Sequence, residues 1–426
     1  MALFAAVSLP FIIVWKIPVY HLLDYRSFSF WAECWSKDSG KIYLNCGANY
    51  PFVGIVASAG ALSTLKTLFE VDGYPQLIHH FQFYLAIFDA LNFVLVWRIA
   101  RALELKYALG IGLLIAALPS SWVGGALWDQ IDDVSQFFLL ASVLCFLTVT
   151  LSNSDKPRWH SVGCFLLGVF ALVSFILTKQ LAVFSLPAVV PLALVAGLRL
   201  WTSGTKIHGA IAAGSAVLSG VALFWFLDSR LEVPSIYHGS SYLFAWLGGS
   251  TKHAEAISGN GFNIWIFLGR DVWSSSKQPF YCLRDTQFCL TSFHSGLMLY
   301  GVYLLALSTF YITLILKLLQ RGGLRDQTRT RFILAVLILY IAQANLGFNV
   351  LLTGTHERYL YHCFPFLILA ACYFAEYTDL ISWRSIVFFP QRRPYTAHLF
   401  LWCSSTPLKS IFLEFPRLPR CFTCCY

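Results

Sequence analysis

The sequence predicts an all-α fold, a polytopic helical bundle that crosses a membrane about 10–11 times and has a long first extracytoplasmic loop. Of the 426 residues, 58% are hydrophobic and only 12% are charged, whereas soluble domains contain about 25% charged residues. The mean hydropathy of +0.65 requires apolar side chains on most of the surface, which only lipid accommodates. These values exclude soluble, disordered, fibrous and small disulfide-rich proteins.

Ten apolar runs have the length that a membrane-spanning helix needs. They cover approximately residues 2–22, 81–99, 106–121, 133–151, 161–178, 181–198, 207–227, 294–317, 332–353 and 359–379. No small-residue cleavage site follows the first run, which we interpret as an uncleaved anchor helix. A stretch at 395–415 is a weaker eleventh candidate because it contains His398 and Lys409. We interpret the apolar run 51–69, which contains Lys66, as a helix lying at the membrane interface.

The distribution of basic residues predicts the orientation of the bundle. With ten crossings and a cytoplasmic N-terminus, every short basic loop lies on one side, as the positive-inside rule requires. These loops contain Arg98, Arg101 and Lys106; Lys156 and Arg158; Arg199 and Lys206; Lys317, Arg321, Arg325, Arg329 and Arg331; and Arg384, Arg392 and Arg393. The opposite side receives the long loops 23–80 and 228–293 and three short turns, around 128–133, 179–180 and 355–358. The net charge of +9 therefore follows from cytoplasmic loops, and we expect no nucleic-acid partner.

The chain is expected to form one transmembrane domain, residues 1–390, followed by a tail of uncertain structure, residues 391–426. No internal repeat or Gly/Ser linker divides the first part. The tail is rich in Arg, Pro and Cys and does not continue the alternation of spans and loops. This organisation predicts an integral, multi-pass protein of a bacterial plasma membrane or of the endoplasmic reticulum membrane.

Four cysteines fall in the two long extracytoplasmic loops. Cys34 and Cys46 belong to the first loop, and Cys282 and Cys289 belong to the second. Each pair could form a disulfide in an oxidising compartment, or remain as buried thiols. Spacing alone leaves both alternatives open.

Acidic side chains stand where two spans meet the extracytoplasmic side. Asp24 follows the first span directly, and a carboxylate at that depth is suited to act as a base or to grip a hydroxyl. The alternative is a helix-terminal charge that pairs with Arg26. The run Trp128-Asp129-Gln130-Ile131-Asp132-Asp133 contains more acids than capping of the next span requires. Three acids could hold a divalent metal, but solvated carboxylates are more common there, and we predict no metal and no cofactor.

Basic side chains occupy two further turns on the same predicted side. Thr355-His356-Glu357-Arg358-Tyr359 lies between two strongly apolar spans, and Lys179-Gln180 forms the tip of a tight hairpin. An Arg fork beside a His is suited to bind phosphate, and a nearby Lys can help. The alternative is that these long side chains simply reach to the interface. In the second long loop, Asn263 and Trp265 belong to a mixture of aromatic and polar residues that suits sugar binding or a membrane-interface belt.

Taken in order, these motifs resemble the GT-C superfamily of polyprenyl-phosphate-sugar glycosyltransferases. The resemblance is to bacterial proteins related to the second mannosyltransferase of glycosylphosphatidylinositol assembly, and more distantly to endoplasmic reticulum glucosyltransferases that use dolichyl-phosphate-glucose. It covers about residues 20–380. The motifs are Asp24-Tyr25 with Trp31 and Tyr50-Pro51, then Trp128 to Asp132, Thr178-Lys179-Gln180, Asn263-Ile264-Trp265, and His356 to Tyr359.

The resemblance implies an inverting transfer of a hexose from a polyprenyl or dolichyl phosphate to a lipid-linked or other glycan acceptor. The expected hexose is mannose. It implies that Asp24 is the general base and that the donor phosphate is bound by His356, Arg358 and Lys179. Sugar or acceptor contacts are implied for Trp128, Gln130, Asp132, Glu357, Asn263, Trp265 and Tyr25.

The sequence departs from the pattern of that family at two positions. It has Asp129 where the family has Gly, and it reads Asn49-Tyr50-Pro51-Phe52 where the family has an acid before Tyr-Pro-Pro. A second catalytic carboxylate is therefore missing. Three alternatives stay open: a transporter or lipid-linked sugar flippase, which also uses intramembrane charges, a glucosyltransferase of the same superfamily, and a homologue without catalytic activity.

Overall fold

The computed structural model describes residues 2–16, 22–71, 73–118, 123–152, 158–203, 206–233, 242, 263–268, 274–282, 289–320, 324, 326–355 and 357–377. Residues up to Glu376 form one compact unit, and the chain from Tyr377 onward belongs to a second unit. The predicted tail 391–426 and the eleventh candidate span 395–415 lie outside the described residues. Everything below concerns the first unit.

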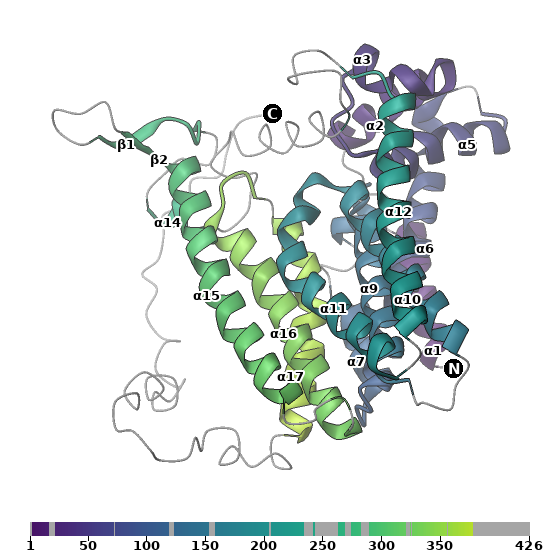
Figure 1. Ribbon diagram of the computed structural model, residues 1–426. Coiled ribbons are helices and arrows are strands. Elements are labelled where there is room, and N and C mark those ends of the chain that lie inside the picture. The colour runs from purple at the N-terminus through teal and green to yellow at the C-terminus, as the bar shows by residue number, and fades with distance from the viewer. Residues whose placement is uncertain are drawn as a thin grey trace, which may run out of the picture. The chain divides into compact units, whose positions relative to one another are not determined.

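Long apolar helices dominate this unit, which confirms an all-α, multi-pass membrane protein (Figure 1). Among the described residues, eight helical segments are long and apolar enough to cross a membrane, and they correspond to eight of the ten predicted spans. Seven of them coincide wholly or largely with a single helix. These helices are α6 (Ile78–Ala102), α9 (Asp132–Thr150), α10 (Arg158–Thr178), α12 (Lys206–Arg230), α15 (Ser292–Gln320), α16 (Gln327–Leu351) and α17 (Phe364–Tyr377). The eighth contains η5 (Gln180–Ser185) and α11 (Leu186–Ser203).

The other two predicted spans form shorter helices among the described residues. Run 2–22 contains α1 (Ala2–Lys16), and run 106–121 contains α7 (Ala108–Ala117). Helix α7 ends where Leu118 becomes extended, because the residue before a proline is disfavoured in the helical region and Pro119 comes next. Both short helices pack against α6.

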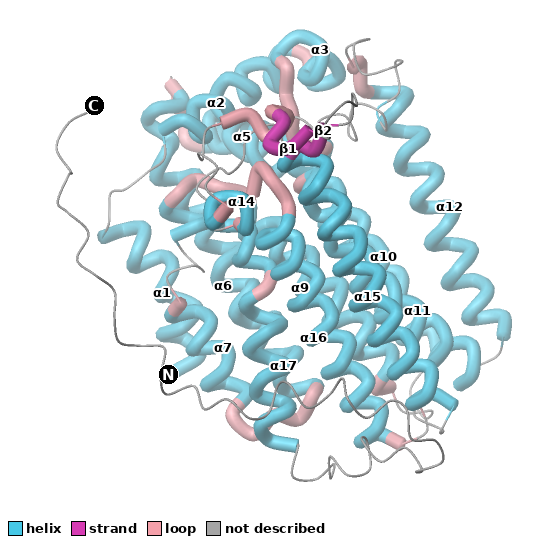
Figure 2. Tube along the Cα trace, turned by 90° about the vertical axis from the view of Figure 1, so that its left-hand side faces the viewer, coloured by secondary structure: helices cyan, strands magenta, loops and turns pink. Residues whose placement is uncertain are grey.

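The long helices differ in how deeply they are buried. Helix α16 is buried along most of its length, whereas α12 and α15 expose most of their apolar side chains, as a lipid-facing helix does. Helix α9 packs against α6, α10 and α11, and α11 packs in turn against α16. Figure 2 shows the long helices of the bundle from a second side.

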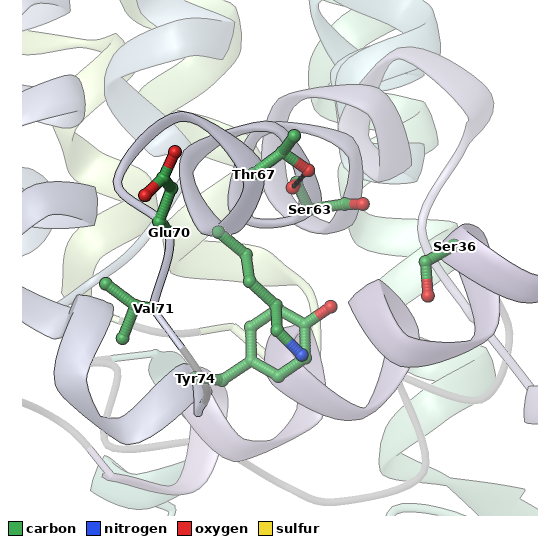
Figure 3. Close-up of a pocket in the computed structure, with 7 residues that line it drawn as sticks. Ser36, Ser63, Thr67, Glu70, Val71 and Tyr74 are labelled. Carbon is green, nitrogen blue, oxygen red and sulfur yellow. Dashed lines mark hydrogen bonds between the residues drawn. The ribbon is translucent and has the colours of Figure 1, made fainter.

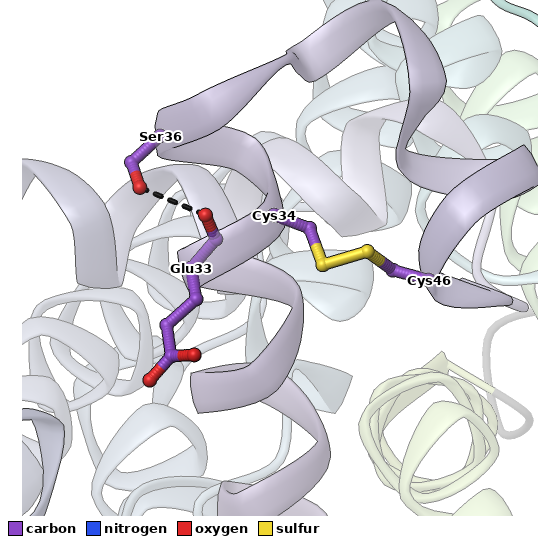
Figure 4. The surroundings of a disulfide bond; sticks show 4 residues. All are labelled: Glu33, Cys34, Ser36 and Cys46. Atoms are coloured by element: carbon purple, nitrogen blue, oxygen red, sulfur yellow. Dashed lines mark hydrogen bonds between the residues drawn. A yellow bond between two sulfur atoms is a disulfide. The ribbon is translucent and has the colours of Figure 1, made fainter.

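The first long loop folds into short helices that pack on one another at one end of the bundle. They are α2 (Leu22–Lys37), η1 (Ser39–Lys41), α3 (Ile42–Cys46), α4 (Phe52–Ile55), η2 (Val56–Gly60), α5 (Ala61–Leu68) and η3 (Tyr74–Leu77). The run predicted at the membrane interface, 51–69, is thus helical. Cys34 on α2 and Cys46 on α3 form a disulfide that joins these two helices (Figure 4).

The second long loop contributes α14 (Ile264–Phe267) and a two-stranded antiparallel sheet, β1 (Pro279–Cys282) with β2 (Cys289–Thr291). The pairing places Cys282 opposite Cys289, and a disulfide joins them. Two further short helices, η4 (Val123–Leu127) and η6 (Glu357–His362), stand before α9 and α17. Both disulfides that the sequence allowed are therefore present.

The predicted basic loops meet at the other end of the bundle. The contacts that join them are an ion pair of Arg331 with Glu104 at 2.5 Å, hydrogen bonds from Arg199 to Leu324 O and Ser152 O at 2.6 and 3.2 Å, and one from Lys106 N to Glu376 at 3.0 Å. These residues lie in or beside four different loops. The described parts of these loops therefore share one end of the bundle. The loop with Arg384, Arg392 and Arg393 lies outside the described residues, and the side of the membrane that this end faces stays a prediction.

Candidate functional site

A buried ion pair between Lys179 and Asp132 joins two of the predicted motifs. Lys179 Nζ lies 2.6 Å from Asp132 Oδ1, and the two side chains are 6% and 1% exposed. Asp132 begins α9, where a carboxylate also faces the free N–H groups of the first helical turn. Lys179 follows α10 directly and holds an extended backbone before η5. Two segments 47 residues apart are thereby joined through a contact that solvent does not screen.

Two aromatic rings enclose the Lys179 ammonium group. Its Nζ lies 5.7 Å from the ring centroid of Tyr50 and 5.3 Å from that of Tyr359, and both rings are buried. Both distances fall within the range of cation–π attraction. The Tyr50 carbonyl accepts a hydrogen bond from Tyr43 Oη at 3.0 Å, which fixes the backbone beside this ring. Four motifs that the sequence spreads over 300 residues therefore meet around one lysine.

Close backbone packing brings the first loop to Lys179. A Cβ atom on Gly54 of helix α4 would overlap the carbonyl oxygen of Thr178, the residue before Lys179. Only glycine therefore lets α4 approach the end of α10 so closely. Phe52 N, at the start of α4, donates to Tyr242 Oη at 2.7 Å. Burial is the main reason that the pKa of Tyr242 is raised to about 12.

The acidic motif before α9 is buried rather than solvated. Asp129, Gln130, Asp132 and Asp133 are all at most 1% exposed, and Trp128 is half-buried. Asp129 has a φ of +56°, a left-handed backbone that reverses the chain between η4 and α9. A residue other than glycine rarely adopts this conformation unless the surrounding structure enforces it. Glycine adopts this conformation without such a cost.

A second acid, absent from the sequence prediction, lies against this motif. Asp89 of α6 and Asp133 of α9 interact through their buried carboxyl groups. Asn92, one turn after Asp89, donates from Nδ2 to Asp133 O at 3.0 Å and to Tyr361 Oη at 3.2 Å. Gly125 leaves the space for the Asp133 carboxylate, since a Cβ there would overlap it. The group links α6, α9 and η6.

The predicted general base, Asp24, lies half-buried in the first turn of α2. Its neighbour Tyr25 is 3% exposed and donates from Oη to the carbonyl of Tyr74. Burial is the main cause that raises the pKa of Tyr25 above its ordinary value, and the negative charge of Asp129 raises it further. This electrostatic effect means that the start of α2 lies near the acidic motif.

Asn263 and Trp265 tie the second long loop to the turn after α16. Asn263 caps α14 and donates from Nδ2 to Leu352 O at 3.2 Å and to Thr355 Oγ1 at 3.3 Å. Trp265 Nε1 donates to Leu351 O at 2.9 Å, and both side chains are buried. These hydrogen bonds hold the turn that precedes η6, which is a positioning role. Sugar contacts for the two residues remain a prediction.

The predicted phosphate-binding turn is described only in part. Glu357 and Arg358 lie in η6, and its next residue, Tyr359, contacts Lys179. His356 lies outside the described residues, and so do the side chains of Glu357, Arg358 and Gln180. Their roles in binding remain predictions.

Sequence reasoning missed Asp89, Asn92, Tyr361 and His362. His362 is buried and its Nε2 lies 3.2 Å from Ser135 Oγ on α9. Asp89 did carry a signal, because an acid inside a predicted span is a candidate functional residue by default. Asn92 has no distinctive pattern around it in the sequence, and Tyr361 and His362 follow the predicted motif His356 to Tyr359 without belonging to it.

A separate polar cavity of about 500 Å³ lies in the first-loop region (Figure 3). Its lining comes from α2, α5 and the segment before α6, and comprises Ser36, Ser63, Lys66, Thr67, Glu70, Val71 and Tyr74. Lys66 Nζ lies 4.9 Å from the centroid of the Tyr74 ring. Within the described part of the chain, no three His, Cys, Asp or Glu side chains gather in a way that could hold a metal ion.

No model of a known protein family matches the chain, and no curated protein matches it either.

Proposed function

We propose that this protein is a membrane glycosyltransferase with a GT-C-like bundle of about 10–11 transmembrane helices. It transfers one hexose, which we propose is mannose, from a polyprenyl or dolichyl phosphate to a lipid-linked or other glycan acceptor. The transfer takes place on the extracytoplasmic or lumenal face. The N-terminus and the basic loops are cytoplasmic, as the positive-inside rule indicates. The membrane is a bacterial plasma membrane or the endoplasmic reticulum membrane.

The observation that carries the proposal is the convergence of motifs on Lys179. Asp132, Tyr50 and Tyr359 contact it directly, and the hydrogen bonds of Asn263 and Trp265 attach the remaining motif to the same turn. Lysine and the neighbouring turn with Arg358 are suited to stabilise the charge that develops on a departing phosphate. Asp24, on the same end of the bundle, takes the proton of the acceptor hydroxyl in an inverting displacement.

The test is a transfer assay with purified protein in lipid vesicles. Radiolabelled polyprenyl-phosphate-mannose and polyprenyl-phosphate-glucose are offered separately, with a native lipid extract as the source of acceptor. We expect product from one donor, and its loss by at least about 100-fold in Asp24→Asn, since general base catalysis contributes roughly that factor. Glu33→Gln, an exposed carboxylate on the same helix, is the matched control and retains activity.

One observation favours the alternative, a transporter or lipid-linked sugar flippase. The buried carboxyl pair of Asp89 and Asp133 lies within the helical bundle, and transporters commonly place acids there. The same vesicles separate the two functions. A labelled polyprenyl-phosphate-sugar that changes leaflet without losing its sugar, equally well in Asp24→Asn, would favour the flippase and contradict the transferase.

A further inference from the structure

Two carboxyl groups lie together inside the bundle, and the proposed transfer reaction uses neither. Asp89 stands near the middle of α6, and Asp133 stands in the first turn of α9. Asp89 is 7% exposed, Asp133 is fully buried, and their carboxyl groups interact. Gly125 packs closely on this pair, because a Cβ at that position would overlap the Asp133 carboxylate.

The charged and titratable groups around this pair do not neutralise it. From α9, Asp132 adds a further negative charge, which Lys179 already balances. From η6, the Tyr361 hydroxyl faces both carboxyl groups, and His362 contacts Ser135. No Lys, Arg or His of the described residues forms an ion pair with Asp89 or Asp133.

A buried amide oxygen completes the arrangement. Asn92 follows Asp89 by three residues, so both side chains project from the same face of α6. Asn92 Nδ2 donates hydrogen bonds to Asp133 O and Tyr361 Oη. Asn92 Oδ1 is buried and accepts no hydrogen bond among the described residues. Together with the four carboxyl oxygens of Asp89 and Asp133, it makes five buried side-chain oxygens without a hydrogen bond of ordinary geometry among the described residues. The groups that interact with the two carboxyls are the Ala126 backbone and the Tyr361 hydroxyl.

Such a group requires a positive charge. Moving one carboxylate from water into the protein interior costs several kcal/mol unless a partner compensates it, and two adjacent carboxylates also repel each other. An all-oxygen group binds a proton or a hard cation rather than a soft metal. A calcium ion takes about six to eight oxygen ligands, more than these five side-chain atoms, which favours an ion of single charge.

We propose that Asp89 and Asp133 form an intramembrane site for one monovalent cation, a proton or a sodium ion, held between the two carboxyl groups with Asn92 Oδ1 beside them. One bound cation lowers the charge of the pair from −2 to −1 and ends the direct repulsion between the two carboxylates, which stabilises the contact of α6 with α9. The bound cation also stabilises the position of η6, because Asn92 beside the site donates a hydrogen bond to Tyr361 of η6. The test of this site measures stability and carboxyl reactivity, so it does not depend on transferase activity.

The experiment measures thermal unfolding of the full-length protein in lipid vesicles, in sodium chloride and in potassium chloride of equal ionic strength, from mildly acidic to mildly alkaline pH. Asp89→Asn and Asp133→Asn are compared with Glu33→Gln, whose carboxylate is exposed. If the ligand is sodium, sodium raises the unfolding temperature above its value in potassium, and both Asn variants lose this rise. If the ligand is a proton, unfolding temperatures fall as the pH rises in the wild type and Glu33→Gln, and this fall is lost in the two Asn variants.

A second measurement needs no variant. It detects the proton even if the carboxyl pair stays protonated over the whole pH range, in which case unfolding would not change with pH. Dicyclohexylcarbodiimide reacts with protonated carboxyl groups in apolar surroundings, and mass spectrometry locates the adduct. Labelling of Asp89 or Asp133 that sodium does not affect supports the proton, and labelling that sodium but not potassium suppresses supports the sodium ion. The proposal is overturned if neither residue is labelled and neither cation nor pH affects the wild type differently from both Asn variants.

Discussion

Removing Lys179 should destabilise the protein far more than removing a lysine from an exposed ion pair. Lys179→Met keeps a side chain of similar length but leaves the Asp132 carboxylate, 1% exposed, without its counter-charge. Breaking a buried pair from one side costs about 3–5 kcal/mol. Loss of the attraction to the Tyr50 and Tyr359 rings adds roughly 0.5–2 kcal/mol. We therefore expect a loss of about 4 kcal/mol or more in the free energy of unfolding.

The chain offers a matched control in the pair of Lys41 and Glu232. These side chains lie 3.8 Å apart and are 44% and 57% exposed, and pairs of this kind contribute about 0–1 kcal/mol. Denaturant titration in mixed micelles of wild type, Lys179→Met and Lys41→Met measures the difference. The double variant Lys179→Met with Asp132→Leu should recover most of the loss, because two well-packed apolar residues can replace a buried pair.

Two results would refute this reasoning. If Lys179→Met costs no more than Lys41→Met, the pair is not as desolvated as its burial indicates. If the double variant is as unstable as Lys179→Met, the loss comes from the lysine's packing rather than from an uncompensated carboxylate. Either result would also weaken the case that Lys179 organises the surrounding motifs.

The remaining predictions concern a glycine, a disulfide and a tyrosine. Gly125→Ala should cost about 1–3 kcal/mol by overpacking, whereas Gly163→Ala, with no atom within 4 Å of the added Cβ, should stabilise its helix by up to about 1 kcal/mol; denaturant titration compares them. Replacing both Cys34 and Cys46 by Ser should remove roughly 3 kcal/mol, as expected for a loop of this size, and unfolding under reducing conditions should reproduce the loss. Because burial raises the pKa of Tyr242 from 10.0 to about 12, its contribution to stability is complete below about pH 10 and is lost as the pH rises through about 12. Unfolding followed at alkaline pH should show this fall in the wild type and a smaller one in Tyr242→Phe.

The long helices of the fold could be predicted because membrane spans leave a strong, local record. Eight apolar runs became eight long helices within a few residues of their predicted bounds. The run 106–121 shows the limit of a hydropathy scan, which averages over residues and does not register one backbone restriction. Its helix ends at Ala117 because of the Leu118-Pro119 step. The tertiary order of the helices carries no such local signal.

The candidate site was predictable where polar residues cluster at helix ends. Asp132 and Lys179 were both selected from their own segments, but their contact depends on the packing of α9 against α10. Asp89 was missed because it is a single acid surrounded by apolar residues, and its partner comes from another helix. Sugar binding by Asn263 stays a prediction, and its hydrogen bonds to the backbone and hydroxyl of a neighbouring turn could not be read from the sequence. Pairwise contacts of this kind are set by the fold as a whole.

The negative charges near Lys179 oppose the binding of a phosphate at the same end of the bundle. Asp132 already balances Lys179, and an ionised Asp89–Asp133 pair beside Asp132 would repel an anion through a poorly screened interior. A monovalent cation at that pair halves its negative charge and so weakens this repulsion. If both proposals hold, the donor phosphate and the cation bind with positive coupling, and each must strengthen the other by the same factor. Binding of polyprenyl phosphate to the wild type should then tighten with sodium or with falling pH, according to which cation is bound. In Asp89→Asn the dependence should be lost, and equal dependence in both proteins would show that the two sites are not coupled.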